Sequence, residues 1–483
     1  MSQAIKFGTS GWRAVIADDF TFANVRRALT GIARYVRSQK AQGARLIVAR
    51  DPRFLGESLV TLAVEVLSNH GITPLVIPEP APTPAVAYEV LRTHADGAIN
   101  FTASHNPPQY NGIKFSTPDG APALPEVTRQ IEANIEEAFS SRQSALSQQK
   151  HGRTTEPDAA VVDSVPQPQP VEIRQPYLDR LRELVDLKAI RQSGIKVAFD
   201  PLWGAARGYT DTLLRNEGSE CVTVHDFRDV LFGGHAPEPD GHLLNDLRQA
   251  MQSHGAAIGV STDGDGDRFG ILDADGTFIQ PNYIVALLFD YLVESRGWRN
   301  GVAKSVATTN LINALAEHHK VPLYETPVGF KFIGELIKQD KIAIGGEESA
   351  GLSIRHHVPE KDGILAGLLC CEMVAKRGEP IATQLRRLFA KVGSFYPLRE
   401  NFRLTPEVKA TFTRKLEAEP RELFGRKVQN VDRIDGMKLV FTDGAWICYR
   451  LSGTEPVVRV YTEARSEADL QKLSAAAKEW IFQ

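Results

Sequence analysis

Short apolar segments alternate with amphipathic segments along most of the chain. In residues 24–37, apolar side chains recur at the spacing of one helix face, and residues 45–49 form a short apolar run typical of a buried strand. Repeated alternation of strand and helix is typical of a mostly parallel sheet with helices on both faces. The pattern therefore predicts an α/β fold.

The same reasoning assigns the remaining elements. Helices are predicted at residues 59–67, 177–187, 209–214 and 284–293 and at the end of the chain. Strands are predicted at residues 4–7, 74–77, 95–99, 195–200, 222–224, 257–261, 269–273, 304–308 and 342–344. From about residue 395 a smaller α+β piece follows, with strands at residues 437–441, 445–449 and 457–461.

Two features interrupt or repeat this pattern. Between residues 140 and 176 the chain is rich in Gln, Ser and Pro, which favours a solvated connector without a function of its own. Residues 98–106, 258–268 and 342–349 share one plan, in which a small apolar strand ends in a polar loop. We interpret them as a faint internal repeat of one α/β unit.

Length and composition limit the possible classes of protein. A chain of 483 residues is too long for one core and suggests roughly three or four domains. A net charge of -3 gives no basic field for nucleic acid or anionic membranes. The N-terminus lacks the apolar core of a signal peptide, no apolar run approaches a membrane span, and the four cysteines lack disulfide-framework or metal-ligand spacing. We therefore expect a cytoplasmic protein with reduced cysteines.

The first polar loop contains Ser104. It follows a predicted strand, and Pro107 and Pro108 prevent both a helix and a continuing strand. A serine at the carboxyl end of an inner strand lies where open α/β sheets place ligand-contacting groups, so Ser104 is a candidate nucleophile. The alternative is that Ser104 and Asn106 only stabilise a turn.

The second polar loop, residues 263–268, reads D-G-D-G-D-R. Its glycines let the backbone fold so that Asp263, Asp265 and Asp267 can face one cation, and oxygen ligands suit Mg²⁺ or a similar divalent ion. A calcium-binding EF-hand loop would need Gly and Glu where Arg268 and Ala274 stand. An Asp-rich hairpin turn is the alternative, but three adjacent carboxylates without a cation would repel one another.

The third polar loop, residues 345–351, reads G-G-E-E-S-A-G. Carboxylates accept hydrogen bonds from paired hydroxyls, so this loop suits a sugar ring, with an acidic surface turn as the alternative. Near the C-terminus, guanidinium groups, two hydroxyls and exposed amides describe a phosphate cradle, for which edge-strand charges are the alternative. The cradle comprises Arg450, Ser452, Gly453, Thr454 and Arg459. The chain has neither a Walker motif nor G-x-G-x-x-G, so nucleotide binding is not supported.

Five motifs together resemble the α-D-phosphohexomutase family, which includes phosphoglucomutases, phosphomannomutases and phosphoglucosamine mutases. They are G-T-S-G-W-R (8–13), T-A-S-H-N-P (102–107), D-G-D-G-D-R (263–268), G-E-E-S-A-G (346–351) and R-L-S-G-T-E-P (450–456). One such motif would be weak, but five in the family's order over nearly the whole chain form a strong resemblance. The bacterial phosphoglucomutases are the most similar members.

The resemblance implies three similar α/β domains with mixed, mostly parallel sheets and a smaller C-terminal α+β domain, arranged around a central cleft. The implied domains are residues 1–185 with the phosphoserine loop, 186–295 with the metal-binding loop, 296–394 with the sugar-binding loop and 395–483 with the phosphate-binding loop.

The resemblance also implies an isomerase that interconverts glucose 1-phosphate and glucose 6-phosphate by intramolecular phosphotransfer. Ser104 would carry the phosphoryl group, and Mg²⁺ would be held by Ser104 with Asp263, Asp265 and Asp267. A sugar bisphosphate, glucose 1,6-bisphosphate, would be intermediate and primer. Phosphoryl transfer mainly needs positioning and charge neutralisation, which Mg²⁺, Arg268 and Lys114 could supply.

Other cleft residues follow from the same resemblance. They are Arg13, Lys114, Lys331, His357 and Lys361, with Glu347 and Ser349 contacting the sugar. Either His105 or Lys114 is expected to handle the proton of the sugar hydroxyl. The run E-E-S resembles the glucose-handling branch, whereas T-E-P is shared with dual-specificity bacterial enzymes, so a phosphomannomutase or a dual-specificity enzyme is the alternative.

Three other classes fit less well. A serine hydrolase using Ser104 and His105 lacks the G-x-S-x-G elbow, and adjacent side chains on an extended backbone would point apart. A haloacid-type phosphatase would need Thr or Val where Asp267 stands. A non-catalytic sugar-phosphate binding protein would keep the phosphate cradle but would not need both Ser104 and the metal loop.

Overall fold

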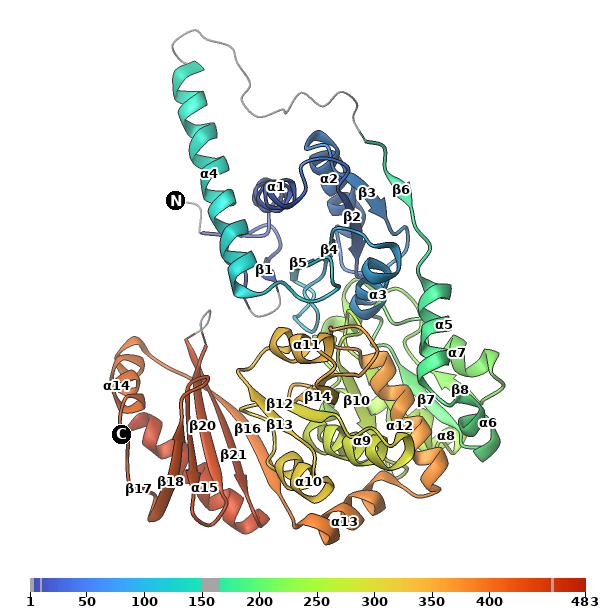
Figure 1. Ribbon diagram of the computed structural model, residues 1–483, viewed down its shortest axis with the longest axis vertical. Coiled ribbons are helices and arrows are strands. Elements are labelled where there is room, and N and C mark those ends of the chain that lie inside the picture. Colours follow the sequence, from blue (N-terminus) through green and yellow to red (C-terminus); the bar gives the residue numbers. More distant parts are fainter. Residues whose placement is uncertain (1–3, 9–10, 150–165, 453–455) are drawn as a thin grey trace. The chain divides into compact units, whose positions relative to one another are not determined.

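A computed structural model describes residues 4–8, 11–149, 166–452 and 456–483 of the protein (Figure 1). The chain divides into two compact units. Unit 1 comprises Met1–Phe278 and Gly351–Gly378, and unit 2 comprises Ile279–Ala350 and Glu379–Gln483.

The first sheet of unit 1 is mixed and has the strand order β1-β5-β4-β2-β3-β6. Its central strands β4, β2 and β3 are parallel, and β5 runs antiparallel to β4 and β1. The strands are β1 (Trp12–Val15), β2 (Arg45–Arg50), β3 (Thr73–Val76), β4 (Ala98–Phe101), β5 (Tyr110–Ser116) and β6 (Gln169–Pro170). The helices are α1 (Phe22–Gln39), α2 (Gly56–Asn69), α3 (Thr83–Thr93), α4 (Pro125–Gln149) and α5 (Arg174–Leu184). Helix α1 packs beside α2 and α4 (Figure 1), and together with this sheet they enclose one apolar core.

The second sheet has the order β11-β10-β9-β7-β8. β7 is parallel to β8 and β9, whereas β10 is antiparallel to β9. The strands are β7 (Val197–Asp200), β8 (Cys221–Thr223), β9 (Ile258–Thr262), β10 (Phe269–Leu272) and β11 (Phe278–Ile279). The helices of this part are α6 (Leu187–Ser193), α7 (Thr210–Asn216), η1 (Phe232–Gly234), η2 (Gly241–Leu243), α8 (Asn245–His254) and α12 (Gly363–Arg377). Helix α12, which follows β15 (Gly351–Ile354), packs on β9 and β10.

Unit 2 begins with another α/β part, in which β12 pairs in parallel with both β13 and β14. Helices α9 and α11 pack on β14. The elements are α9 (Pro281–Arg296), β12 (Gly301–Ser305), α10 (Leu311–His319), β13 (Leu323–Thr326), α11 (Phe330–Lys338), β14 (Ile342–Glu347) and α13 (Ile381–Val392).

The C-terminal part of unit 2 is built on an antiparallel sheet of order β16-β21-β20-β19-β18-β17, and α15 packs on β16 and β21 (Figure 1). The elements are β16 (Tyr396–Arg403), α14 (Pro406–Leu416), β17 (Glu422–Leu423), β18 (Arg426–Asp432), β19 (Met437–Phe441), β20 (Trp446–Leu451), β21 (Val457–Ala464) and α15 (Glu467–Phe482). The predicted fold class, α/β domains followed by an α+β piece, is confirmed.

The three repeat segments occupy matching places. β4 lies between a parallel neighbour, β2, and an antiparallel one, β5. β9 likewise lies between β7 and β10 with the same directions, and β14 has β12 as its parallel neighbour. Each strand is buried along its whole length and leads into one of the polar loops. These strands are apolar because both faces of each are covered.

Two predictions about secondary structure are wrong. Residues 4–7 form no strand, because the amide of Phe7 donates to a carboxylate oxygen of Glu132 in α4 (2.8 Å) and pairing in the sheet begins only at Trp12. The predicted connector at residues 140–176 is partly regular, since α4 continues to Gln149 and the segment also contains β6 and the start of α5. The helix extends that far because the chain has no Gly or Pro from Glu126 to Gln149. Residues 150–165 lie outside the described residues.

Within the described ranges, no helix is both long enough and apolar enough to cross a lipid bilayer. The four cysteines are free, and Cys370 and Cys371 in α12 and Cys448 in β20 are buried.

Helix α12 begins in close contact with residues 263–268, which are called the metal loop after the role predicted for them. The amide of Gly363 donates to the carbonyl oxygen of Gly266 (3.1 Å), and a Cβ atom at residue 363 would lie 2.2 Å from the carbonyl oxygen of Arg268. We expect Gly363→Ala to lower the free energy of unfolding by at least about 1–3 kcal/mol, because backbone on both sides must shift. Urea denaturation measures this loss, and a change below about 0.5 kcal/mol would contradict the close packing.

Candidate active site

Ser104 lies in the loop between β4 and β5, and its side chain is buried. Its backbone is in the left-handed region (φ 51°), which is uncommon for residues other than glycine. The hydroxyl oxygen of Ser104 donates to Oδ2 of Asp263 at 2.6 Å. The candidate nucleophile and the first aspartate of the metal loop are therefore in direct contact, although 159 residues separate them in the sequence.

The expectation that the side chains of Ser104 and His105 point apart is wrong. It assumed an extended backbone, whereas the left-handed conformation of Ser104 brings its hydroxyl oxygen to 3.3 Å from Nδ1 of His105. The contact to Asp263 is the shorter one, so the carboxylate is the main acceptor of the hydroxyl proton.

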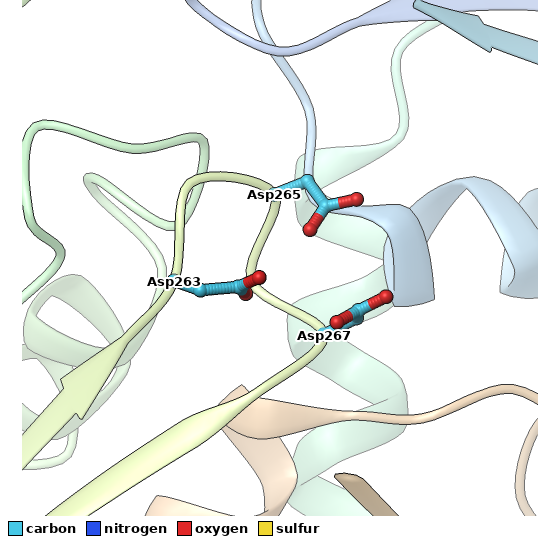
Figure 2. A group of neighbouring side chains, drawn as sticks. All are labelled: Asp263, Asp265 and Asp267. Atoms are coloured by element: carbon cyan, nitrogen blue, oxygen red, sulfur yellow. The ribbon is translucent and has the colours of Figure 1, made fainter. Parts of the chain in front are cut away.

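The metal loop connects β9 and β10, and its three aspartates are buried. Figure 2 shows Asp263, Asp265 and Asp267 projecting from this one loop, and a ligand oxygen from each lies within 4.8 Å of the others. A Cβ atom at Gly264 would lie 2.6 Å from the carbonyl oxygen of Ser104, so only glycine lets the loop approach the serine this closely.

The three carboxylates have different electrostatic surroundings. Burial, with the charges of Asp265 and Asp267, raises the pKa of Asp263 well above its usual range. Burial also raises the pKa of Asp267, but Lys114 and Lys361 outweigh it and hold this pKa well below the usual range. Burial and the charge of Asp267 raise the pKa of Asp265, but Lys114 outweighs them and the net shift of this pKa is downward.

Two buried lysines neutralise part of this charge. Nζ of Lys114 donates to Oδ2 of Asp265 (2.6 Å) and of Asp267 (2.7 Å), and Nζ of Lys361 donates to Oδ2 of Asp267 (2.7 Å). Burial lowers the pKa of Lys114, but the two aspartates outweigh it and the net shift is upward. Lys114 is therefore protonated at neutral pH, which makes it a poor proton acceptor.

The donor set fits a divalent metal ion. Oδ1 of Asp265 and Oδ1 of Asp267 are buried and have no hydrogen-bond partner among the described residues. Buried carboxylate oxygens without a partner are costly, and a cation compensates them. Three carboxylates at this spacing are hard oxygen ligands, so they could hold such an ion.

Two arginines border the same site. Nη1 of Arg13 donates to Oδ1 of Asn106 in the serine loop, residues 102–110 (2.9 Å). Burial lowers the pKa of Arg13, whereas the negative charges of Asp263, Asp265 and Asp267 act upward. The backbone amide of Arg268 donates to Oδ1 of Asp263 (3.0 Å), and its guanidinium lies 3.6 Å from Glu238.

His357 belongs to the same unit and is held by Asp362. Nε2 of His357 lies 2.7 Å from Oδ2 of Asp362, and the hydroxyl of Tyr177 donates to that same oxygen (2.6 Å). Nδ1 of His357 is buried without a partner among the described residues. One ring nitrogen is therefore fixed, and the other is left for a ligand or a proton.

The predicted sugar loop lies in unit 2. The amide of Gly329, just before α11, donates to Oε1 of Glu347 (2.7 Å), and Lys331 lies in the first turn of that helix. Ser349 is half-buried in the turn after β14. Glu348 serves a different purpose, because its Oε2 accepts hydrogen bonds from the hydroxyls of Ser305 (3.0 Å) and Thr308 (3.3 Å).

The predicted phosphate cradle is also in unit 2. Arg450 and Arg459 are opposite each other in the pairing of β20 with β21. Nη2 of Arg450 lies 2.7 Å from Oδ2 of Asp435, and Ser452 is buried at the end of β20. Burial lowers the pKa of Arg450, but the bond to Asp435 outweighs it and the pKa is raised. Gly453 and Thr454 lie outside the described residues.

Several residues that contact Ser104 and the aspartates of residues 263–268 are not recognisable from the sequence. Thr83, at the start of α3, donates through its hydroxyl to Oδ2 of Asp265 (2.7 Å) and through its amide to the carbonyl oxygen of Asp265 (2.8 Å). Asp51 and Arg53 contact the serine loop directly. Their only signal in the sequence is their position after the buried strand β2, at the edge of the sheet where Ser104 also lies.

Comparison with known families identifies the class of this protein. The chain matches models described as phosphoglucomutase/phosphomannomutase, alpha/beta/alpha domains I, II and III, at residues 4–142, 175–276 and 280–392. It also matches the model of the C-terminal domain of that family at residues 407–479. The chain belongs to the phosphoglucomutase/phosphomannomutase family, and is thus an isomerase of the phosphohexomutase type. The predicted family is confirmed.

Individual members of the family are similar to this chain along nearly its whole length. A phosphoglucomutase/phosphomannomutase from Thermococcus kodakarensis is 29% identical over 95% of both chains. Phosphoglucomutase-1 of Bos taurus is 30% identical and covers 97% of this chain and 91% of its own. A solved structure from Thermus thermophilus, provisionally named a phosphomannomutase, is 30% identical, covers 100% of both chains and has a TM-score of 0.84.

Proposed function

We propose that the protein interconverts glucose 1-phosphate and glucose 6-phosphate through a phosphorylated Ser104 and a bisphosphorylated glucose. The observation that carries this proposal is the 2.6 Å hydrogen bond from the Ser104 hydroxyl to Asp263, within a buried group of three aspartates. Glucose 1,6-bisphosphate would phosphorylate the serine initially. The serine oxygen then gives its phosphoryl group to one end of the sugar phosphate and receives another from the opposite end.

Mg²⁺ is the cation we propose for Asp263, Asp265, Asp267 and the oxygen of Ser104. Bound there, it would neutralise charge on the transferring phosphoryl group. The chain's own residues supply the remaining charge and position: Lys114 and Lys361 compensate the aspartates, and Arg13 and Arg268 are available to phosphoryl oxygens.

The residues of unit 2 would bind the substrate. Glu347 and Ser349 are suited to sugar hydroxyls, and Lys331 lies in the first turn of α11, directly after Gly329, whose amide contacts Glu347. We assign the phosphate that is not reacting to Arg450, Ser452, Gly453, Thr454 and Arg459. Holding that phosphate orients the sugar, which is a large part of the work in phosphoryl transfer.

A histidine is the better candidate for the proton of the sugar hydroxyl. The raised pKa of Lys114 argues against it as the acceptor. His105 lies beside the Ser104 hydroxyl, and His357 has a buried ring nitrogen without a partner among the described residues. The nitrogen of a neutral imidazole ring can accept a proton and later return it, so either ring is suited to exchange a proton with the substrate.

We retain domain boundaries at residues 185/186, 295/296 and 394/395 and a cytoplasmic location as proposals. The location is supported by the four free cysteines.

Mannose phosphates are the second candidate substrates, since two of the relatives carry phosphomannomutase in their names. A coupled assay that follows conversion of glucose 1-phosphate with Mg²⁺ and a bisphosphate primer tests the proposal, with mannose 1-phosphate in parallel. We expect faster turnover of glucose 1-phosphate. Turnover of neither sugar would refute the proposed reaction, and faster turnover of mannose 1-phosphate would replace the substrate only.

The sugar contact can be tested at Glu347. Glu347→Gln keeps an oxygen for the amide of Gly329 but removes the charge that strengthens a hydrogen bond from a sugar hydroxyl. We expect KM to rise about 10-fold to 100-fold, equivalent to roughly 1.5–3 kcal/mol, with stability almost unchanged. Glu348→Gln is the matched control, because Ser305 and Thr308 already occupy that carboxylate. An equal rise of KM in both variants would contradict the assignment of Glu347.

A further inference from the structure

Arg53 is a fully buried arginine that contacts the serine loop, residues 102–110. It follows β2 and is 0% exposed. Its Nη2 donates to the carbonyl oxygens of Ser104 (2.7 Å) and Asn106 (2.6 Å), and its Nη1 donates to those of Pro107 (2.9 Å) and Tyr110 (3.0 Å). One guanidinium thus binds four carbonyl groups along the loop that carries the candidate nucleophile.

The fifth N–H group of the guanidinium connects this contact to the other side of Ser104. Nε of Arg53 donates to Oδ2 of Asp51 (3.0 Å), which also accepts from the hydroxyl of Thr102 (2.7 Å). The same hydroxyl accepts from the amide of Ser104 (2.8 Å). The carbonyl and the amide of Ser104 are therefore both held by the Asp51–Arg53 pair.

Ser104 needs such support because its backbone is in an unfavourable conformation. A residue other than glycine at positive φ persists only where the surrounding structure enforces it. The two prolines at 107 and 108 have no amide hydrogen, so this part of the loop has fewer hydrogen bonds of its own. A planar guanidinium with five donors matches five fixed acceptors, whereas an ammonium group has only three donors.

We propose that Arg53 is a positioning residue that fixes the direction of the Ser104 hydroxyl by holding the carbonyl groups of the serine loop. This proposal rests on the proposed function, because it assigns Arg53 a part in the same phosphoryl transfer. Arg53 would not touch the substrate. Its contribution is to remove loop conformations in which the serine oxygen is misplaced, and misplacement of about 1 Å can cost 100-fold in rate.

Arg53→Lys tests the proposal, with Arg45→Lys as the matched control. Arg45, at the other end of β2, also donates to two backbone carbonyls, those of Thr93 (2.8 Å) and His94 (3.1 Å), but not to the serine loop. We expect R53K to lower kcat about 100-fold per folded molecule and to change KM less than about 3-fold. Hydrogen exchange of the amides in the serine loop should become faster in R53K, and R45K should leave both kcat and this exchange unchanged.

The result that would overturn the proposal is an R53K enzyme with wild-type kcat, or one whose loss of activity equals its loss of folded protein while exchange in the serine loop is unaltered. If R53K does not fold, Asp51→Asn removes the charge that orients Nε of Arg53, with little change in volume, and the same two measurements decide. Absence of mutase activity in the wild-type protein would refute the proposed function instead, and the exchange measurements would still report on the arginine.

Discussion

Replacing Ser104 with alanine is expected to reduce conversion of glucose 1-phosphate by at least about 10⁴-fold, because removal of a nucleophile leaves no oxygen to carry the phosphoryl group. The protein should still fold, since loss of the hydrogen bond to the Asp263 carboxylate costs about 1.5–3 kcal/mol, which is less than the stability of a typical protein. The coupled assay measures the rate, and mass spectrometry after incubation with glucose 1,6-bisphosphate measures phosphorylation of the protein. We expect a phosphorylated wild type and an unmodified variant.

Ser261→Ala is the control for this experiment. Ser261 is a buried serine in β9, two residues before the metal loop, and its hydroxyl has no partner among the described residues. Its removal should leave the rate within about 2-fold of the wild type, since it breaks no hydrogen bond. Turnover by S104A close to that of S261A, or phosphate bound elsewhere in S104A, would disprove a phosphoserine at residue 104.

The second large effect concerns the metal loop. We expect Asp263→Asn to abolish most of the activity. It should also abolish the increase in melting temperature that Mg²⁺ produces in the wild type. In EDTA, however, the variant should be at least as stable as the wild type. The one oxygen of asparagine can still accept from the Arg268 amide, and its NH2 group can donate to the Ser104 hydroxyl, while repulsion from Asp265 and Asp267 disappears. Thermal melts with and without Mg²⁺ measure the stabilisation that the ion produces. For the wild type, Mg²⁺ at 100 times its Kd should raise the free energy of unfolding by about 2.7 kcal/mol.

Asp267→Asn should behave differently. Asp267 accepts from both Lys114 and Lys361, so its loss leaves two buried ammonium groups poorly compensated and should destabilise the protein even in EDTA. Equal stability of the two variants in EDTA, or a Mg²⁺-dependent shift that survives in D263N, would contradict this account of the loop.

The same pKa shifts predict how stability and metal binding depend on pH. The pKa of Asp263 is raised in the folded protein, so in EDTA this group adds stability as pH falls through that pKa, and D263N should lack this gain. The pKa of Asp267 is lowered, so its contribution is present above the unfolded pKa and is lost as pH falls towards the folded one. Because Mg²⁺ needs the deprotonated form of Asp263, its affinity should weaken as pH falls through the raised pKa of this carboxyl.

Much of the fold was predictable because the buried strands are short apolar runs between polar loops. β4, β9 and β14 are buried on both faces, and this makes their sequences distinctive. The grouping of the three aspartates was predictable for a similar reason, since D-G-D-G-D places the carboxylates and the flexible glycines within five residues. Local sequence was sufficient wherever the relevant residues are neighbours in the chain.

Local sequence was insufficient where contacts between residues far apart in the chain decide the structure. The strand predicted at residues 4–7 does not form because Glu132 binds the amide of Phe7. Arg53 looks like an ordinary polar residue after a strand, and its role becomes visible only when residues 104–110 fold against it. The geometry of Ser104 and His105 depends on a left-handed backbone that no residue type in the loop indicates.

The buried cysteines are natural probes of unfolding in each of the two units. Burial raises the pKa of Cys448 to about 12 and shifts the pKa values of Cys370 and Cys371 upward as well, so none of the three thiols should react with a labelling reagent while the fold is intact. Cys370 and Cys371 lie in α12 of unit 1 and Cys448 lies in β20 of unit 2. The rates at which these thiols are alkylated in dilute denaturant therefore time the unfolding of each unit separately, without any introduced probe.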